Sequence, residues 1–240
     1  MSKIPVLEIF GPTIQGEGMV IGRKTMFVRT AGCDYKCSWC DSAFTWDGTG
    51  KEDIKLLTAE EIWKQLVLTG GTRFDHVTIS GGNPALLAAL DPFILLLKEK
   101  GISVALETQG SKWQDWFYQI DDLTISPKPP SSGMQTNFPL LDTIIANLQE
   151  NKNVFSLKVV VFDQDDFEYA IKVHARYPAV SFYLQVGNDD IHNGNNDELL
   201  SKLLGKYEWL IEKTIESSEM NDVRVLPQLH AFVWGNKRGV

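Results

Sequence analysis

Short apolar segments rich in β-branched residues recur along the chain, and longer segments with helical periodicity separate them. Many of the apolar segments are continuous rather than alternating, which is typical of strands that are covered on both faces. The segments that predict strands are Val6–Phe10, Met26–Arg29, Val77–Ser80, Ser103–Glu107, Leu123–Ser126, Phe155–Val161, Phe182–Val186 and Val223–Leu226.

The segments between them predict helices. Thr58 and Glu61 form the signature of a capping box, so a helix is expected from there towards Leu68. Pro84 is expected to open a second helix that runs towards Lys100, because proline is favoured in a first helical turn. Further helices are predicted at Leu140–Gln149, Asp165–Ala175 and Asp197–Thr214.

This alternation of strand and helix favours parallel pairing through right-handed crossovers. We therefore expect one α/β domain over residues 1–240, with its sheet curled into a partial barrel. Ligands of such sheets bind at the carboxyl ends of the strands. The polar motifs that follow predicted strands should share one site; they are Gly32–Cys40, Ser80–Pro84, Glu107–Gly110, Ser126–Lys128, Gln185–Asn188 and Gln228–His230.

Charge and cysteine content limit the partners and the cellular setting that are expected for the chain. The 23 Lys and Arg against 31 Asp and Glu give a net charge of −8, which disfavours nucleic acid and anionic membranes as partners. No apolar run reaches the roughly 18 residues that span a bilayer. The 3 cysteines are an odd, closely spaced set that cannot be fully paired within the chain, so a reducing cytoplasm is the expected setting.

The cysteines occupy a single loop, at Cys33, Cys37 and Cys40. Three thiolates can hold three corners of a 4Fe-4S cluster and leave the fourth iron free for another ligand. The alternative is a zinc site, which needs a fourth protein ligand, and His76 or Asp34 are the candidates. A non-catalytic metal-binding module therefore stays open on the residues alone.

The cysteine loop resembles that of the radical S-adenosylmethionine (SAM) superfamily. In that family SAM chelates the open iron, and an electron from the cluster cleaves its adenosyl C–S bond, so the radical chemistry rests on cluster and cofactor rather than on a catalytic side chain. The segment Ser80–Pro84 resembles the family's GGEP motif, with Asn83 in place of the acidic residue. The resemblance implies SAM contacts from Trp39, Cys40, Asp41, Gly82, Asn83, Glu107, Ser126, Pro127, Lys128, Gln185 and Asn188.

Several of these residues also have ordinary structural interpretations. Glu107 could be a salt-bridge partner, Lys128 a solvated charge, and Gln185 a buried core residue with its hydrogen bonds satisfied. The glycines of Ser80–Pro84 could belong to a simple turn after a strand.

A second resemblance covers almost the whole chain. The segments Glu8–Gly18, Phe27–Cys33, Ser126–Lys128, Leu157–Val160 and Gln228–His230 are similar to those of the 7-carboxy-7-deazaguanine synthase family. Members convert 6-carboxy-5,6,7,8-tetrahydropterin into 7-carboxy-7-deazaguanine with loss of ammonia, towards queuosine and other deazapurines, and they regenerate SAM. The resemblance also implies Mg²⁺ at Ser42, although Ser42 could instead cap a turn.

For the pterin, the same resemblance implies contacts from Ile14, Gln15, Gly16, Glu17, Arg29, Ser80 and His230. Amide and carboxylate groups can match a guanine-like edge, and a guanidinium can bind a carboxylate in a fork. Residues 15–18 could instead form an ordinary turn, and His230 could be a core imidazole. Arg29 stands in a predicted strand, where its charge requires an anionic partner.

One further enzyme class uses the same radical: activating enzymes that abstract hydrogen from a partner protein, which would need an open groove. The family resemblance implies instead a small-molecule substrate, a flavodoxin-like or other electron donor, and a homodimer.

Overall fold

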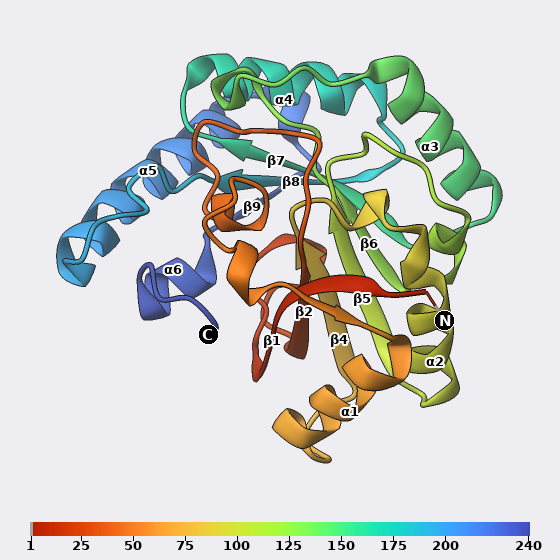
Figure 1. Ribbon diagram of the computed structural model, residues 1–240. Coiled ribbons are helices and arrows are strands. Elements are labelled where there is room, and N and C mark those ends of the chain that lie inside the picture. The colour runs from red at the N-terminus through yellow and green to blue at the C-terminus, as the bar shows by residue number, and fades with distance from the viewer. Residues whose placement is uncertain (1) are drawn as a thin grey trace.

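The strands of the molecule form one curved sheet, and α1 to α5 follow one another around its outer side (Figure 1). The computed structural model describes residues 2–240. The strands are β1 Ile4–Ile14, β2 Lys24–Thr30, β3 Lys55–Leu57, β4 His76–Gly81, β5 Ser103–Thr108, β6 Asp122–Ile125, β7 Phe155–Val161, β8 Ser181–Val186 and β9 Arg224–Leu226. The α-helices are α1 Ala59–Gly70, α2 Asp91–Glu99, α3 Phe138–Glu150, α4 Gln164–Arg176, α5 Asn196–Glu216 and α6 Leu229–Trp234.

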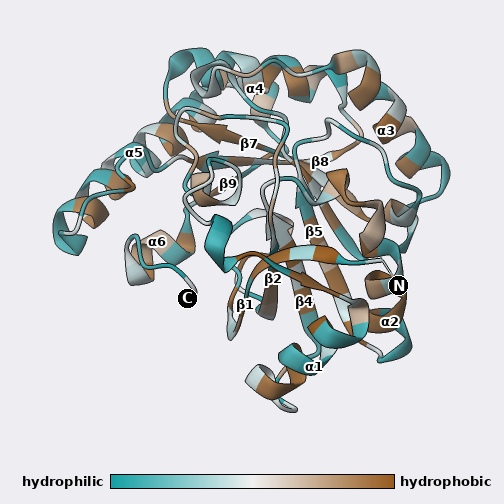
Figure 2. Ribbon diagram, viewed as in Figure 1, coloured by the Kyte–Doolittle hydropathy of each residue, from teal (hydrophilic) through white to brown (hydrophobic). Residues whose placement is uncertain are grey.

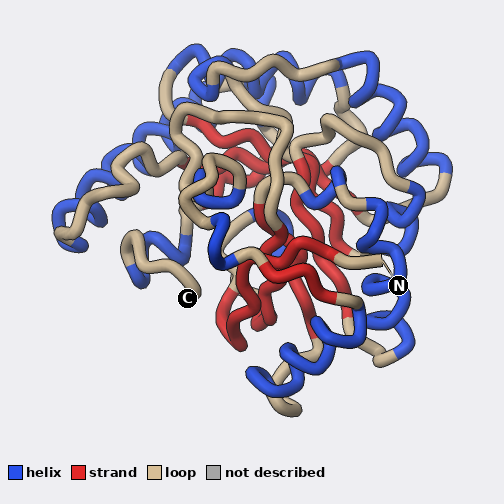
Figure 3. The backbone as a smooth tube through the Cα atoms, in the orientation of Figure 1, coloured by secondary structure: helices blue, strands red, loops and turns tan. Residues whose placement is uncertain are grey.

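The sheet has 9 strands in the order β3-β1-β2-β4-β5-β6-β7-β8-β9. Every neighbouring pair from β2 through β9 is parallel, whereas β1 runs antiparallel to both β2 and β3. Since β3 and β9 stand at opposite edges and do not pair, the sheet curves without closing (Figure 3). The predicted α/β fold with a partial barrel is confirmed.

The apolar residues of the strands form the core together with one face of each covering helix. Figure 2 shows brown segments concentrated along the strands. In β4, Val77 and Ile79 are fully buried, and in α1 Ile62 and Leu66 are fully buried opposite exposed polar residues. This packing explains the continuous apolar segments, because strands of a parallel sheet are covered on both faces.

All the strands predicted from the sequence are present, with ends that shift by a few residues. The capping box of α1 is confirmed: the Glu61 amide donates to the Thr58 hydroxyl, and the Thr58 amide donates to the Glu61 carboxylate. The short strand β3 and the helix α6 were not predicted. Both are too short for periodicity to identify them.

The helix predicted from Pro84 is wrong in its start. Pro84 opens a single 3-10 turn, Pro84–Leu86, and α2 begins only at Asp91. Pro92 explains the difference, because a proline is tolerated in the first turn of a helix but would break a helix that began eight residues earlier. The segment therefore forms two separate elements, a 3-10 turn that begins at Pro84 and the helix α2, which has Pro92 in its first turn.

The parallel strands end together at one edge of the sheet, where the loops after β2, β4, β5 and β8 meet (Figure 1). This edge carries the polar motifs that the sequence singled out. Within residues 2–240, no helix combines the length and apolar character that a membrane crossing requires.

Candidate functional site

A cavity of about 280 Å³ opens at the carboxyl ends of the strands, between the cysteine loop, the turn after β1 and the carboxyl terminus of the chain. It brings together most of the residues that the sequence predicted: Ile14, Gln15, Gly16, Glu17, Arg29, Cys33, Cys37, Trp39, Cys40, Asp41, Ser42, Ser80, Gly82, Glu107, Lys128, Asn188 and His230. These residues come from segments far apart in the sequence, so the cavity is the shared site that parallel topology predicts.

Four predicted SAM residues, Asn83, Ser126, Pro127 and Gln185, lie behind the cavity wall rather than on it. Asn83 is fully buried, and its amide already bonds to Thr108, Asp34, Ser111 and the Ala85 amide. Asn83 thus caps the 3-10 turn that begins at Pro84.

Gln185 is also fully buried, and only its oxygen is used. Its Oε1 accepts from the Gly18 amide at 3.4 Å, while its Nε2 has no hydrogen-bond partner within the chain. The interpretation of Gln185 as a satisfied core residue is therefore wrong, because a buried amide donor is left over.

The three cysteines are free thiols, each partly buried on the wall of the cavity. Burial raises the pKa of all three thiols, that of Cys37 to about 11. Without metal they are therefore protonated at neutral pH. Because a thiolate is the ligand form, the positive charge of iron must displace these protons.

Neighbouring loops hold the cysteine loop in place. The Ser38 amide donates to the Ser132 carbonyl at 3.1 Å, and the Trp39 indole donates to the Ser131 hydroxyl at 2.9 Å. Ser131 in turn donates twice to the buried carboxylate of Asp166, at 3.0 and 2.6 Å. The loop is thus anchored through residues 131–132 to the start of α4.

The geometry does not favour the zinc interpretation. His76 begins β4, five residues before its last residue, Gly81, so at about 3.3 Å per residue it lies roughly 16 Å from the edge that carries the cysteines. Sulfur ligands of tetrahedral zinc are about 3.8 Å apart. Among the described residues, the three Sγ atoms are not a group of ligand atoms that all lie within 4.8 Å of one another.

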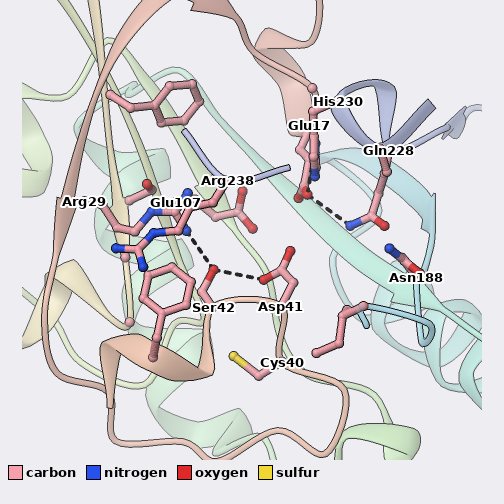
Figure 4. A pocket seen from close by; sticks show the side chains of 18 of the residues that line it. Glu17, Arg29, Cys40, Asp41, Ser42, Glu107, Asn188, Gln228, His230 and Arg238 are labelled. Carbon is pink, nitrogen blue, oxygen red and sulfur yellow. Dashed lines mark hydrogen bonds and ion pairs between the residues drawn. The ribbon is translucent and has the colours of Figure 1, made fainter. Parts of the chain in front are cut away.

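A buried ammonium lies behind the acidic residues of the cavity. Lys158 of β7 is 1% exposed, and its Nζ lies 2.7 Å from Glu17 Oε2 and 2.6 Å from Glu107 Oε1. Burial alone would raise the pKa of Glu17, but Lys158, and to a lesser degree His230, hold it well below the ordinary range. Glu17 also accepts from Gln228 Nε2 at 3.1 Å (Figure 4).

Arg29 lies at the opposite wall and has a partner within the chain. Its Nε is 2.6 Å from Glu8 Oε1, and its Nη1 donates to the Ser42 hydroxyl at 2.8 Å (Figure 4). Arg238, near the carboxyl terminus, donates to the other oxygen of Glu8 at 2.9 Å. The guanidinium groups of Arg29 and Arg238 lie 5.4 and 3.9 Å from the centre of the Phe44 ring.

Oxygen and nitrogen ligand atoms also gather between these two walls. Ligand atoms of Glu17, Asp41 and His230 all lie within 4.8 Å of one another, and the Ser42 hydroxyl donates to Asp41 Oδ1 at 3.0 Å. Ser42 precedes a 3-10 turn, but its side chain makes no capping hydrogen bond. The turn-cap interpretation of Ser42 is thus wrong for its hydroxyl.

Comparison with known proteins places this geometry in a family. The model of the radical SAM superfamily matches residues 27–128. The 7-carboxy-7-deazaguanine synthase of Bacillus cereus is 66% identical over 240 residues, which is 100% of both chains. That of Bacillus subtilis is 67% identical over 239 residues, 99% of this chain and 98% of the relative. The chain belongs to the 7-carboxy-7-deazaguanine synthase family. Membership of the radical SAM superfamily implies a 4Fe-4S cluster and SAM.

Solved structures share the fold. QueE from Escherichia coli superposes with a TM-score of 0.70 at 23% identity, over 95% of each chain. SuiB from Streptococcus suis, bound to its precursor peptide SuiA, superposes with a TM-score of 0.57 at 16% identity, over 86% of this chain and 49% of that one. At such identities the likeness concerns the fold alone. With the whole-chain relatives named as synthases, neither the activating-enzyme nor the metal-module alternative is favoured.

Sequence reasoning missed several site residues of this synthase-family chain. The sequence could have identified Lys158, because a lysine inside the apolar segment Leu157–Val161 of β7 must be paired with an opposite charge when it is buried. Glu8 and Arg238 had none, since their contact joins residues 230 positions apart.

Gly82 gives a prediction about the cluster loop. A Cβ at this position would lie 2.2 Å from the Gly32 carbonyl oxygen and 3.0 Å from Cys33 Cβ. Gly82→Ala should therefore displace the start of the loop, at an overpacking cost of about 1–3 kcal/mol. We expect iron content after anaerobic reconstitution to fall from about four per chain to a small fraction of that. Gly205→Ala is the matched control, because open space surrounds Gly205 in α5; normal iron in Gly82→Ala would show that the close approach is not needed.

Proposed function

We propose that this chain converts 6-carboxy-5,6,7,8-tetrahydropterin into 7-carboxy-7-deazaguanine with release of ammonia, as one radical SAM domain over residues 1–240 with lyase activity. The observation that carries the proposal is the whole-chain identity to synthases that are named for this product. The cavity supports it, since three free thiols and a set of polar groups suited to a small ligand line one space.

The residues present suit the cofactors. Cys33, Cys37 and Cys40 are unpaired, lie on one loop and have no fourth cysteine in the sequence, as a cluster with an open iron requires. When bound there, the cluster and SAM would supply the radical chemistry for hydrogen abstraction from the pterin. We propose that the Gln185 amide and the backbone around Gly82 receive SAM, because a buried unpaired donor and close backbone approach are available there.

The chain's own residues would bind and orient the pterin. Gln15 Oε1 accepts from the Gly16 and Glu17 amides at 2.7 and 3.2 Å, so its NH₂ group is the part that can serve a ligand. Glu17 stays ionised beside Lys158 and offers an acceptor. A donor and an acceptor on one wall match the edge of a guanine-like ring.

Anaerobic turnover tests the function directly. The reconstituted enzyme is incubated with the carboxylated tetrahydropterin, SAM, reductant and Mg²⁺, and the products are identified by mass spectrometry. We expect 7-carboxy-7-deazaguanine and ammonia, and only background product with Cys33→Ala, Cys37→Ala or Cys40→Ala. If wild-type enzyme that holds about four irons forms no deazaguanine, the proposed function is wrong.

Arg29 is proposed to pair with the substrate carboxylate as well as with Glu8. Its side chain is 18% exposed on the cavity wall, and only part of its planar group is used by Glu8 and Ser42. A guanidinium can bind two acceptors in different directions. When the substrate binds, Arg29 would therefore pair with the substrate carboxylate while it keeps its ion pair with Glu8.

Arg29→Ala should lower product formation while SAM cleavage and iron content persist. Leaving the substrate carboxylate unpaired costs roughly 2–5 kcal/mol, a fall of some tens to thousands of fold in kcat/KM. Arg29→Lys should recover little, because an ammonium cannot reproduce the planar group. Arg176→Ala, which removes an exposed arginine paired with Asp142, is the control. A joint loss of iron, SAM cleavage and product in Arg29→Ala would instead assign Arg29 a structural role.

Mg²⁺ is proposed to bind at the Ser42 hydroxyl, which contacts the neighbouring Asp41 carboxylate. The ion prefers oxygen ligands and keeps several waters, so few protein groups are enough. The two side chains already lie 3.0 Å apart on the cavity wall.

Ser42→Ala should raise the Mg²⁺ concentration needed for half-maximal product formation, by about tenfold, and leave SAM cleavage by the reduced cluster intact. Ser42→Thr keeps the hydroxyl and should behave as wild type. An unchanged Mg²⁺ response in Ser42→Ala would remove Ser42 from the metal site.

The remaining expectations concern partners. We propose a flavodoxin-like or other electron donor, a homodimer and a cytoplasmic setting that keeps the thiols reduced. Light scattering of the reconstituted enzyme, reduction assays with candidate donors and cell fractionation test them in turn. A monomer, no reduction by any of the candidate donors, and recovery outside the cytoplasm would overturn them individually.

A further inference from the structure

The side chains of Trp46 and Gln109 donate hydrogen bonds to two of the three cysteine sulfurs. The Trp46 indole Nε1 lies 3.5 Å from Cys40 Sγ. The Gln109 amide Nε2 lies 3.6 Å from Cys33 Sγ. An indole N–H and an amide NH₂ group can only donate, so the sulfur is the acceptor in both contacts.

Trp46 is held in position by the turn that it ends. It follows the 3-10 turn Ala43–Thr45, and its backbone amide donates to the Ala43 carbonyl at 2.9 Å. The Thr45 carbonyl accepts from the Gly32 amide at 2.8 Å, which joins the turn to the residue before the first cysteine. The indole therefore reaches the last cysteine from a fixed backbone, and its ring forms part of the cavity wall.

Gln109 is held by a carboxylate of the cysteine loop. It directly follows β5 and is 5% exposed. Its Nε2 also donates to Asp34 Oδ1 at 2.6 Å, and the Asn83 amide donates to the same oxygen at 2.9 Å. Because a carboxylate only accepts, the contact with Asp34 determines that the nitrogen of the Gln109 amide, and not its oxygen, faces Cys33.

These contacts stabilise negative charge on the sulfurs. Burial raises the pKa of the Cys40 thiol, and the hydrogen bond from Trp46 is the largest of the influences that lower it. The Cys37 sulfur, by contrast, receives no side-chain donor among residues 2–240. The donors thus favour charge on the two sulfurs that they contact.

The same preference acts on the oxidation state of an iron-sulfur cluster. In the reduction step the oxidised cluster takes up one electron from the reduced donor, which loses one, and no bond forms or breaks. The added electron makes the ligand sulfurs more negative, so a hydrogen bond to them stabilises the reduced state more than the oxidised state. Hydrogen bonds to sulfur are accordingly among the influences that set the potential of such clusters.

We propose that Trp46 and Gln109 raise the reduction potential of the cluster held by Cys33, Cys37 and Cys40, each through its hydrogen bond to a cysteine sulfur. The inference rests on the proposed function, in which these cysteines hold the cluster. Both are positioning residues, because they act through the sulfurs. With the higher potential, the one-electron donor keeps a larger share of the cluster reduced.

The test is the midpoint potential of the reconstituted enzyme without SAM or pterin, measured at a series of poised potentials by electron paramagnetic resonance of the reduced cluster. Trp46→Phe keeps an aromatic ring and removes the N–H. We expect a lower midpoint potential. At the wild-type midpoint, the ratio of reduced to oxidised cluster should fall about threefold to tenfold, which is about 30–60 mV for a one-electron couple. Iron content should stay at about four per chain.

Two further variants complete the design. Trp113→Phe is the matched control, because the Trp113 indole donates to Asp115 Oδ1 at 2.8 Å rather than to a sulfur; it should keep the wild-type potential. Gln109→Met removes the second donor at similar side-chain length, while Asp34 keeps its hydrogen bond from Asn83. Its potential should also fall, and it decides the matter if Trp46→Phe loses its cluster.

The outcomes separate this inference from the proposed function. An unchanged potential in iron-loaded Trp46→Phe overturns the inference, as does an equal fall in Trp113→Phe. Loss of iron from both Trp46→Phe and Gln109→Met overturns it too, because the two residues would then be structural. If the potentials shift as expected but the wild-type enzyme forms no deazaguanine, the proposed function is wrong and the inference stands.

Discussion

The parallel run of strands from β2 to β9 is the constraint on which the rest of the molecule depends. Parallel neighbours place all their carboxyl ends at one edge, so loops that are distant in sequence must meet there. The sheet is open, with β3 and β9 as its outer strands, and the turn after β1 and the carboxyl-terminal residues form the remaining walls of the cavity. A single topological rule thereby assembles the cysteines, the acidic residues and the arginines around one cavity.

Charge within the cavity is balanced locally rather than by the protein as a whole. The chain carries a net charge of −8, yet each carboxylate on the two main walls lies beside a cation. Lys158 neutralises the Glu17 and Glu107 side, and Arg29 with Arg238 neutralises Glu8. Such pairs are costly to break, about 3–5 kcal/mol when one partner of a buried pair is removed. The two walls thus present fixed polar groups that are paired with opposite charges, whereas Asp41 between them is in no ion pair among the described residues.

The conformation of the cysteine loop depends more on contacts with neighbouring segments than on hydrogen bonds within the loop. It makes few internal backbone hydrogen bonds, and it is held from one side by residues 131–132, backed by Asp166, and from the other by the Gly82 turn. Because burial keeps its thiols protonated without metal, the scaffold positions the ligands and iron supplies the charge that ionises them. Cluster assembly and loop order are therefore linked.

The sequence alone determined the strands, the order of strand and helix, the partial barrel and the cysteine motif, since all of these follow from local periodicity and close spacing. It also located most of the cavity, because motifs at carboxyl ends of parallel strands must converge. Only the tertiary structure decided the pairing of charges, because it shows that Arg29 and Arg238 both pair with the carboxylate of Glu8. It also shows that Asn83 lies behind the cavity wall. It also placed Lys158 between two acids. These contacts join residues separated by up to 230 positions, and no local pattern encodes which opposite charge a buried side chain will meet once the sheet has folded.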